Sequence, residues 1–193
     1  MAVAGGLVAR LERFAAGRAG LGLVGLWALA EAICWPIVPD VAIGLLVALM
    51  PRRTLPLFLV LVAGALAGTA VLYALALAAP DAVASMLLAL PGIHQPMLDG
   101  ATQTVAGGSP AAIALLGPGT PLKVYTWAWA VGPGTPLALA VGVVINRITR
   151  VGPTVLVLAV IGRLAPGFLR RHHRPALAIY ALSYVVLYAI YWR

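Results

Sequence analysis

The sequence predicts an all-α integral membrane protein in which two opposed re-entrant helical hairpins, an inverted repeat, are joined by several spanning helices. The first observation is composition: of 193 residues, 63% are hydrophobic and only 9% are charged, and the mean hydropathy is +1.03. Soluble domains are roughly 45–50% apolar and about 25% charged, so one soluble core cannot bury this much apolar surface. The second observation is that each half of the chain contains an apolar run interrupted by prolines near a charge.

The chain begins with a basic segment, residues 1–18, before the first apolar run. Arginines followed by an apolar stretch that ends in "ALAEA" also resemble a secretory signal peptide with a cleavage site before Glu31. The apolar character continues to Met50, which favours a membrane segment over a leader that is removed. We treat residues 1–193 as a single membrane domain.

The first interrupted run, residues 19–50, is predicted to be a re-entrant hairpin. It is too long for one crossing, which needs roughly 20 residues, and too short for two crossings and a turn. Pro36 and Pro39 lack an amide hydrogen and disfavour helix in the preceding residue, so the break is expected there, close to Asp40. Broken backbone at membrane depth is tolerated only where protein or water covers it, so the break implies a cavity.

A continuous spanning helix, residues 55–79, follows, and its Gly64 and Gly68 would let another helix approach closely. Residues 80–110 are predicted to form an external loop with one interfacial helix capped by Asp81. Four apolar side chains of that helix fall on one face: Val83, Met86, Leu87 and Leu90. The stretch that starts at Asp99, "DGATQTVAGGSP", is predicted to be a polar loop.

The second interrupted run, residues 111–146, carries the hexamer GPGTPL twice, and between the two copies lies Lys123, the only lysine of the chain. The first copy is predicted to be the break of a second hairpin, and the second copy its outer end, followed by an arm from Leu137 to Ile145. The residues expected to break the helix are Gly117, Pro118, Gly119 and Pro121. Two C-terminal helices complete residues 151–192, one over 152–166 and one over 175–192.

Arginines suggest a topology, because short cytoplasmic loops are enriched in basic residues. Arginines flank both ends of the first run, which places both of its ends in the cytoplasm: Arg10, Arg13, Arg18, Arg52 and Arg53. No lysine or arginine occurs between Arg53 and Lys123, so the loop between them is expected outside. Arg147 and Arg150 fit less well, because this topology puts them near the outer face.

Three charged residues lie within the apolar runs: Glu31, Asp40 and Lys123. At roughly 2.5–3.5 kcal/mol each, they would together cost on the order of 8–10 kcal/mol if they were ionised and unpaired in lipid. They must therefore pair, contact water or, for the acids, take up protons. Desolvation and a neighbouring cation have opposite effects on the pKa of a carboxyl, so a carboxyl subject to both could bind and release a proton. A static ion pair that locks the two hairpins together is the other interpretation of the same residues.

Several motifs, taken in order, resemble the DedA group of bacterial membrane proteins, the SNARE-associated or VTT superfamily. They are "EAICWPIVPD", "GALAGTAVLY" and "GPGTPLKVYTWAWAVG" followed by "INRITR". The resemblance implies opposed re-entrant hairpins, a multi-pass location in the bacterial inner membrane, and proton-dependent movement of undecaprenyl phosphate or a phospholipid between leaflets. Glu31 and Asp40 match the family's acids, Lys123 the hairpin cation, and Arg147 and Arg150 the later basic pair. The sequence departs from the family pattern at Tyr73, which no glycine follows.

The predicted function is a flippase-like transporter of an anionic lipid, not an enzyme, coupled to protons and compatible with a homo-oligomer. Lys123, with Arg147 or Arg150, would contact the lipid phosphate, while Glu31 or Asp40 would take up the proton. No cofactor, metal or nucleic acid is expected. A proton-coupled transporter of small solutes or ions, a lipid-modifying membrane enzyme and a structural scaffold are the alternatives.

Two further features are assigned to packing or to the membrane surface. The last helix carries tyrosines at helical spacing that could line a lipid path, although packing or an interfacial aromatic belt is the favoured interpretation: Tyr180, Tyr184, Tyr188 and Tyr191. Arg163, inside an apolar helix, is expected either to extend toward the membrane surface or to pair with Asp40.

Overall fold

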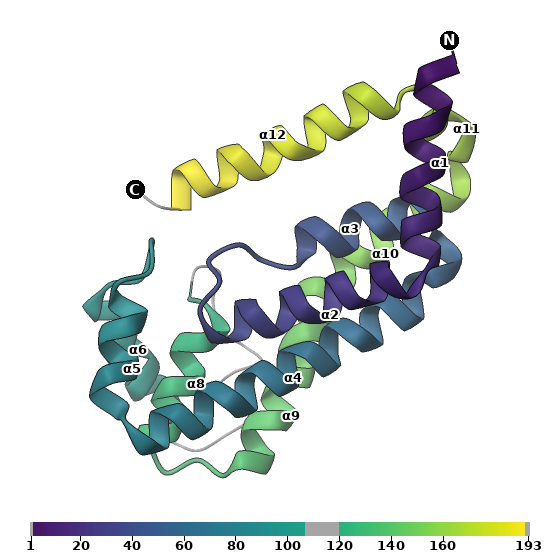
Figure 1. Ribbon diagram of the computed structural model, residues 1–193. Coiled ribbons are helices and arrows are strands. Elements are labelled where there is room, and N and C mark those ends of the chain that lie inside the picture. The colour runs from purple at the N-terminus through teal and green to yellow at the C-terminus, as the bar shows by residue number, and fades with distance from the viewer. Residues whose placement is uncertain (1, 107–119, 192–193) are drawn as a thin grey trace.

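A computed structural model describes residues 2–106 and 120–191, and this part of the chain is helical without strands (Figure 1). The α-helices are α1 (Ala2–Ala16), α2 (Arg18–Ile33), α3 (Asp40–Leu49), α4 (Thr54–Ala78), α5 (Pro80–Leu88), α6 (Gln95–Val105), α8 (Leu122–Val131), α9 (Pro136–Asn146), α10 (Gly152–Leu164), α11 (Pro166–Arg171) and α12 (His173–Tyr191). A 3-10 turn, η1 (Pro51–Arg53), precedes α4, and a π-helical turn, η2 (Arg147–Val151), joins α9 to α10.

The prediction of an all-α fold is confirmed for the described residues, and two apolar helices support the prediction of a membrane protein. Two helical stretches, Pro51–Ala78 and Pro136–Leu164, are long and apolar enough to cross a membrane. A third crossing would result if Ala9–Ala16 and Arg18–Ile33, which meet at 72°, formed one bent span. The bend falls at Gly17, where an extended backbone separates α1 from α2.

The α2 and α4 helices run parallel to each other in direct backbone contact. A side-chain carbon on Gly64 would collide with the carbonyl of Gly25, and one on Gly68 would collide with the carbonyl of Leu29. Contacts therefore advance in the same direction along both helices, and the glycine pair predicted to allow close helix approach does so here. Because these glycines have no side chains, the two helices lie close together, and Val24 and Leu61 are buried in the cluster that the helices share.

The chain reverses after α2, so the two ends of the 19–50 run lie at the same end of α4. The α2 helix stops at Ile33, a non-helical stretch crosses Pro36 to Pro39, and α3 returns to η1 immediately before α4 starts. Proline explains the break, because a proline amide cannot donate to the helix and its ring restricts the residue before it. The predicted location of the first break agrees with the structure.

The α9, η2 and α10 helices form one continuous stretch, whereas the sequence predicted an arm ending at Ile145 and a separate helix from Gly152. Gly162 packs against the backbone of Ala48, and Gly44 lies against Leu158, so α10 runs parallel to α3. The stretch is therefore antiparallel to α4. Arg147 and Arg150, expected near the outer face, lie near the middle of this long helix.

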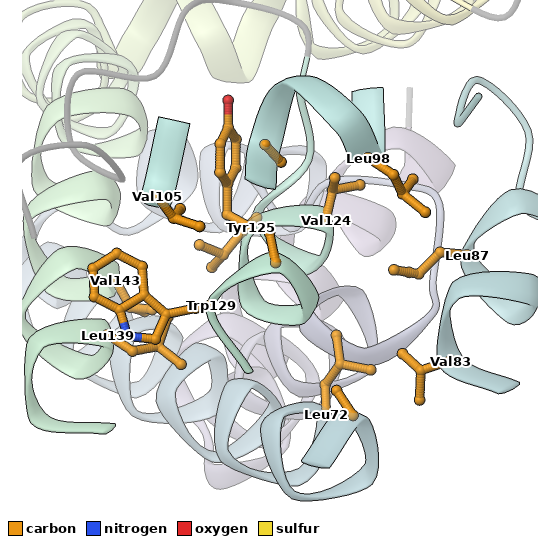
Figure 2. Close-up of a cluster of buried hydrophobic side chains, with 14 of the residues drawn as sticks. Leu72, Val83, Leu87, Leu98, Val105, Val124, Tyr125, Trp129, Leu139 and Val143 are labelled. Carbon is orange, nitrogen blue, oxygen red and sulfur yellow. The ribbon is translucent and has the colours of Figure 1, made fainter. Parts of the chain in front are cut away.

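The region after α4 packs α5, α6 and α8 around an apolar cluster, shown in Figure 2. Val83 and Leu87 of the predicted interfacial helix are buried there. The prediction of a polar loop that starts at Asp99 is wrong for Asp99 to Val105, because these residues belong to α6. Leu98, Ala101 and Val105 recur on one helical face and are buried, so tertiary packing prevails over the weak helix propensity of Gly100.

The two copies of the repeated hexamer have separate places in the chain. Gly117, Pro118 and Gly119 of the first copy lie outside the described residues, while Pro121 is the extended residue immediately before α8. The second copy connects α8 to α9. There the indole of Trp129 donates to the Thr135 carbonyl at 2.9 Å, and the Thr135 hydroxyl accepts from the Ala138 amide and caps α9.

Candidate functional site

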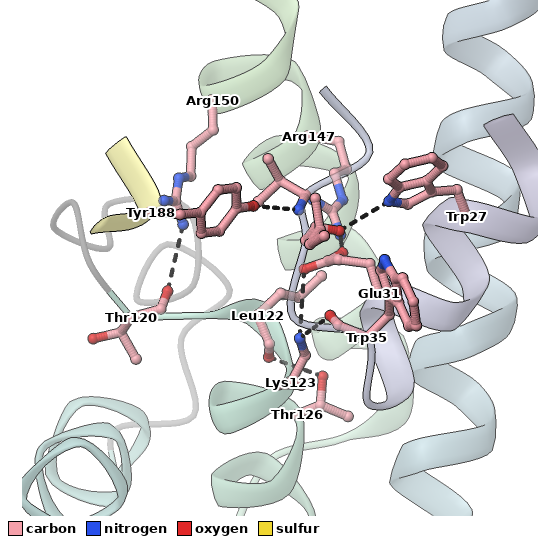
Figure 3. A network of polar contacts seen from close by, with 12 residues as sticks. Trp27, Glu31, Trp35, Thr120, Leu122, Lys123, Thr126, Arg147, Arg150 and Tyr188 are labelled. Atoms are coloured by element: carbon pink, nitrogen blue, oxygen red, sulfur yellow. Dashed lines mark hydrogen bonds and ion pairs between the residues drawn. The ribbon is translucent and has the colours of Figure 1, made fainter. Parts of the chain in front are cut away.

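All five charged residues selected from the sequence line one cavity of about 440 Å³ between the two halves of the chain. They come from four elements: Glu31 from α2, Asp40 from α3, Lys123 from α8, and Arg147 and Arg150 from η2. Figure 3 shows how Glu31, Lys123, Arg147 and Arg150 lie relative to one another. Residues far apart in the sequence thus converge on one polar centre. The volume lies within the range of about 300–1,000 Å³ typical of small-ligand sites.

Glu31 is the centre of the cluster and contacts two cations. Its Oε2 accepts a hydrogen bond from Nη2 of Arg147 at 2.5 Å, and its Oε1 lies 4.0 Å from Nζ of Lys123. All three side chains are nearly excluded from the surface, with exposed fractions of 3% to 6%. Burial of one acid with two cations is compatible with a low-dielectric site, because each charge has an opposite neighbour.

Lys123 connects α8 to the break after α2. It lies in the first turn of α8, directly after Pro121, and its Nζ donates to the carbonyl of Trp35 at 2.8 Å. That carbonyl belongs to the non-helical stretch after α2, where it has no partner from a regular helical turn. The ammonium group therefore bridges the first break and Glu31.

Asp40 begins α3, where the helix amino terminus favours a negative charge. Its Oδ1 is buried and has no hydrogen-bond partner among the described residues, although the side chain lines the cavity. The Nε of Arg147 is also buried without a partner in the described part of the chain. One acceptor and one donor thus remain for protons, water or a ligand at the site.

The cavity carries an excess of positive charge when its ionisable groups are charged, because three cations face two carboxylates. Arg150 is the most accessible of the cations, and its Nη1 lies 3.4 Å from the carbonyl of Thr120. Its exposed side chain lies beside the deeply buried Arg147, so the positive charge extends from the interior toward the opening. This distribution favours an anion that enters from the side of Arg150.

A π-helical turn carries Arg147 and Arg150, which are three residues apart and both line the cavity. Pro153 follows η2 and has no amide hydrogen, so the regular helical bonding before it is interrupted. Single π turns widen a helix locally and occur frequently at functional sites. Asn146, directly before the turn, is buried and lines the cavity as well, a residue that the sequence analysis missed.

The site lies beside the middle part of α4, one of the two helices long and apolar enough to cross a membrane. Gly68 of α4 packs beside Leu29, two residues before Glu31, and lies about 20 Å from the start of α4 and about 15 Å from its end at 1.5 Å per residue. A hydrocarbon core is about 30 Å thick. Glu31 therefore lies at a level that a crossing α4 would place inside the hydrocarbon.

The α12 helix contacts the first break through tyrosine hydroxyls, which the expectation of packing or an aromatic belt did not include. Tyr188 Oη accepts from the amide of Val38 at 2.6 Å, and Tyr180 Oη donates to the carbonyl of Asp40 at 2.9 Å. The Tyr188 hydroxyl and the indole of Trp27, which donates to the Ile37 carbonyl, satisfy backbone groups that the break leaves without helical partners, whereas Tyr180 bonds to the first residue of α3. Tyr188 also lines the cavity.

We expect the substitution Tyr188→Phe to destabilise the first break, because it leaves the Val38 amide without its acceptor. An unsatisfied buried amide costs roughly 1–3 kcal/mol, so the thermal unfolding midpoint in detergent should fall measurably. Tyr73→Phe on α4 is the control, since the hydroxyl of Tyr73 makes no hydrogen bond among the described residues. Equal midpoints for the two variants would contradict a role for the Tyr188 hydroxyl.

Arg163, which the sequence analysis named as a possible partner of Asp40, is not at the site. Arg163 does not line the central cavity and lies instead at the far end of α10, so its predicted pairing with Asp40 is wrong. The second hairpin's break residues 117–119 fall outside the described part of the chain.

Comparison with known proteins adds no relative. No family model matches the chain, and neither a curated protein nor a solved structure matches it. The resemblance to the DedA group therefore rests on the motifs alone and stays a prediction.

Proposed function

We propose that the protein is a multi-pass membrane transporter that moves an anionic lipid phosphate between the leaflets and couples this movement to protons. The observation that carries the proposal is the convergence of Glu31, Asp40, Lys123, Arg147 and Arg150 on one cavity at crossing depth. Charges at this depth are costly and usually serve a substrate or proton path. A bacterial inner membrane location and movement of undecaprenyl phosphate or a phospholipid follow from the DedA resemblance and are part of the same proposal.

The architecture proposed for this function is a pair of opposed re-entrant hairpins. It is supported by the chain reversal between α2 and α3, whose outer ends lie at one end of α4. It is also supported by Lys123, which enters from the second interrupted run and bonds to the break of the first at Trp35. Binding sites between facing broken helices are typical of transporters with inverted repeats.

An anionic lipid suits the cavity better than a neutral substrate. Its phosphate can accept hydrogen bonds from the Lys123 ammonium and the Arg150 guanidinium, which are charge-assisted and comparatively strong. Apolar side chains of α12, among them Leu187 and Ile190, line the same cavity beside the charges. A polar head and an apolar tail therefore both find matching surfaces, and the tail can remain in the bilayer.

Proton coupling is proposed through Asp40. Glu31 is held by two cations, whereas the Oδ1 of Asp40 has no partner among the described residues and is free to exchange a proton. Protonation removes a negative charge from the cavity and so strengthens its attraction for an anion. Deprotonation adds that charge back and favours release. No enzymatic step, cofactor or metal is part of this proposal.

The proposal is tested with the purified chain in vesicles that contain a trace of a fluorescent phosphatidic acid or a fluorescent polyprenyl phosphate. A membrane-impermeant reductant bleaches the label in the outer leaflet, and the slow phase reports lipid that crosses. We expect vesicles with protein to lose the protected label faster than protein-free vesicles, and faster still under an imposed pH gradient. Identical kinetics with and without protein, together with uptake of labelled phosphate ion, would instead favour a small-solute transporter.

We expect Asp40→Asn to transport lipid at a rate that no longer responds to the pH gradient. Asparagine matches the protonated acid in shape and charge, so the cavity stays in its anion-binding state. Transport is measured in the same vesicles with and without the gradient, and Asp99→Asn, an exposed acid on α6, is the matched control. A variant whose rate still rises with the gradient as in the wild type would exclude Asp40 as the proton carrier.

A further inference from the structure

A second groove, of about 980 Å³, lies at the opposite end of α3 and α10 from the central cavity. Three arginines from three separate segments line it: Arg13 in the last turn of α1, Arg52 in η1 and Arg163 in the last turn of α10. We propose that this groove is a second anion site, which binds the phosphate of an anionic lipid head group at the membrane surface. The site does not depend on transport through the central cavity.

The groove lies where head groups are found if the two long helices cross a membrane. It contains Pro51, at the start of one crossing stretch, and Arg163, one residue before the end of the other. Both stretches thus have an end at this groove, on the side that the arginine distribution assigns to the cytoplasm. Anionic lipids of that leaflet attract basic clusters close to the membrane.

The three guanidinium groups are available for a ligand. All three side chains are exposed, and none has an ion pair or a side-chain hydrogen bond in residues 2–106 and 120–191. The groove includes one acid, Glu12, which already has an interaction of its own. Planar guanidinium groups bind both carboxylate and phosphate oxygens in pairs of hydrogen bonds. A phosphate has more oxygens than a carboxylate, so it can contact three guanidinium groups around one groove.

Backbone contact keeps the arginine-bearing elements in place. A side-chain carbon on Gly162 would collide with the carbonyl of Ala48, so α3 and α10 touch directly at the floor of the groove. Arg163 follows Gly162, and η1 follows α3 after Met50. The apolar side chains of Leu49 and Met50 also line the groove and offer a surface for the first carbons of an acyl chain.

One alternative is that the three arginines only determine the membrane topology. That role requires basic residues near a helix end, but it does not require them to surround one groove. A second alternative is that the arginines only offset the partial negative charge at the carboxyl ends of α1 and α10. That role would use Arg13 and Arg163 but leaves Arg52 unexplained. A lipid phosphate accounts for all three.

The test compares two triple variants of the full chain with the same change in charge. One replaces the groove arginines, Arg13→Gln, Arg52→Gln and Arg163→Gln; the control replaces arginines of the same region outside the groove, Arg10→Gln, Arg18→Gln and Arg53→Gln. Binding of dioctanoyl phosphatidic acid is measured by native mass spectrometry in detergent, with dioctanoylglycerol and inorganic phosphate as parallel probes.

The wild type and the control should bind phosphatidic acid at the groove, and the groove variant should bind it about tenfold more weakly. None of the three proteins should bind dioctanoylglycerol well. If inorganic phosphate alone displaces the phosphatidic acid, the groove is a site for a free anion and not for a lipid. Lys123→Met, which alters the central cavity, should retain the groove binding, so failure of the transport proposal would not remove this one. Equal affinities of the two triple variants would overturn it, and if the groove triple does not fold, Arg52→Gln alone gives the same comparison.

Discussion

The substitution Glu31→Gln should cost about 3–5 kcal/mol of stability and abolish most lipid movement, the largest single effect expected in this chain. Glutamine keeps the volume of the side chain but removes the charge that faces Arg147 at 2.5 Å and Lys123 at 4.0 Å. Two buried cations are then left with a neutral neighbour, and Asp40 is the remaining acid that lines the cavity. The measurement is thermal unfolding in detergent together with the vesicle assay.

The control for this prediction is Asp99→Asn, which removes one acid from an exposed site on α6. Its Oδ1 accepts a hydrogen bond from Gln95, and an asparagine oxygen can accept the same bond. Exposed charges contribute roughly 0–1 kcal/mol, so both the unfolding midpoint and the rate should stay close to those of the wild type. A Glu31→Gln protein as stable as this control would mean that the buried cations do not depend on the acid.

The sequence was sufficient to predict the all-helical membrane class and the break after α2 because both depend on local chemistry. Apolar composition over a long stretch requires a membrane or a very large core, and Pro36 and Pro39 act on their own neighbours. The convergence of Glu31 with Lys123 was predicted from the cost of burying charges in lipid, which is also independent of the fold.

Features that depend on tertiary packing could not be predicted in this way. The α6 helix contains Gly100 and three threonines or glutamines near its end, and burial of one apolar face against α8 is its main stabilisation. The tyrosine hydroxyls of α12 reach backbone groups about 140 and 150 residues away, at Asp40 and Val38, which no local pattern indicates. The continuous helix through Arg147 depends on a π turn, for which the sequence signal is only a following proline.

The substitution Lys123→Met should reduce lipid movement roughly 10- to 150-fold while it costs less stability than Glu31→Gln. A charge-assisted hydrogen bond to a phosphate is worth roughly 1.5–3 kcal/mol, which sets the size of the loss in rate if the contact forms on the transport path. Stability falls less because Glu31 keeps its hydrogen bond to Arg147, and the Trp35 carbonyl is the group that loses its donor. Methionine preserves most of the buried apolar stem.

The double variant Glu31→Gln/Lys123→Met separates a transport site from a static ion pair. Removing both members of the pair leaves fewer unmatched charges than Glu31→Gln alone, so the double variant should regain part of the lost stability. If the pair served only to lock the two halves together, lipid movement would return with stability. We expect the double variant to be more stable than Glu31→Gln and still inactive, because no ammonium remains to hold the phosphate. Recovery of wild-type rates in the vesicle assay would assign Lys123 and Glu31 to structure.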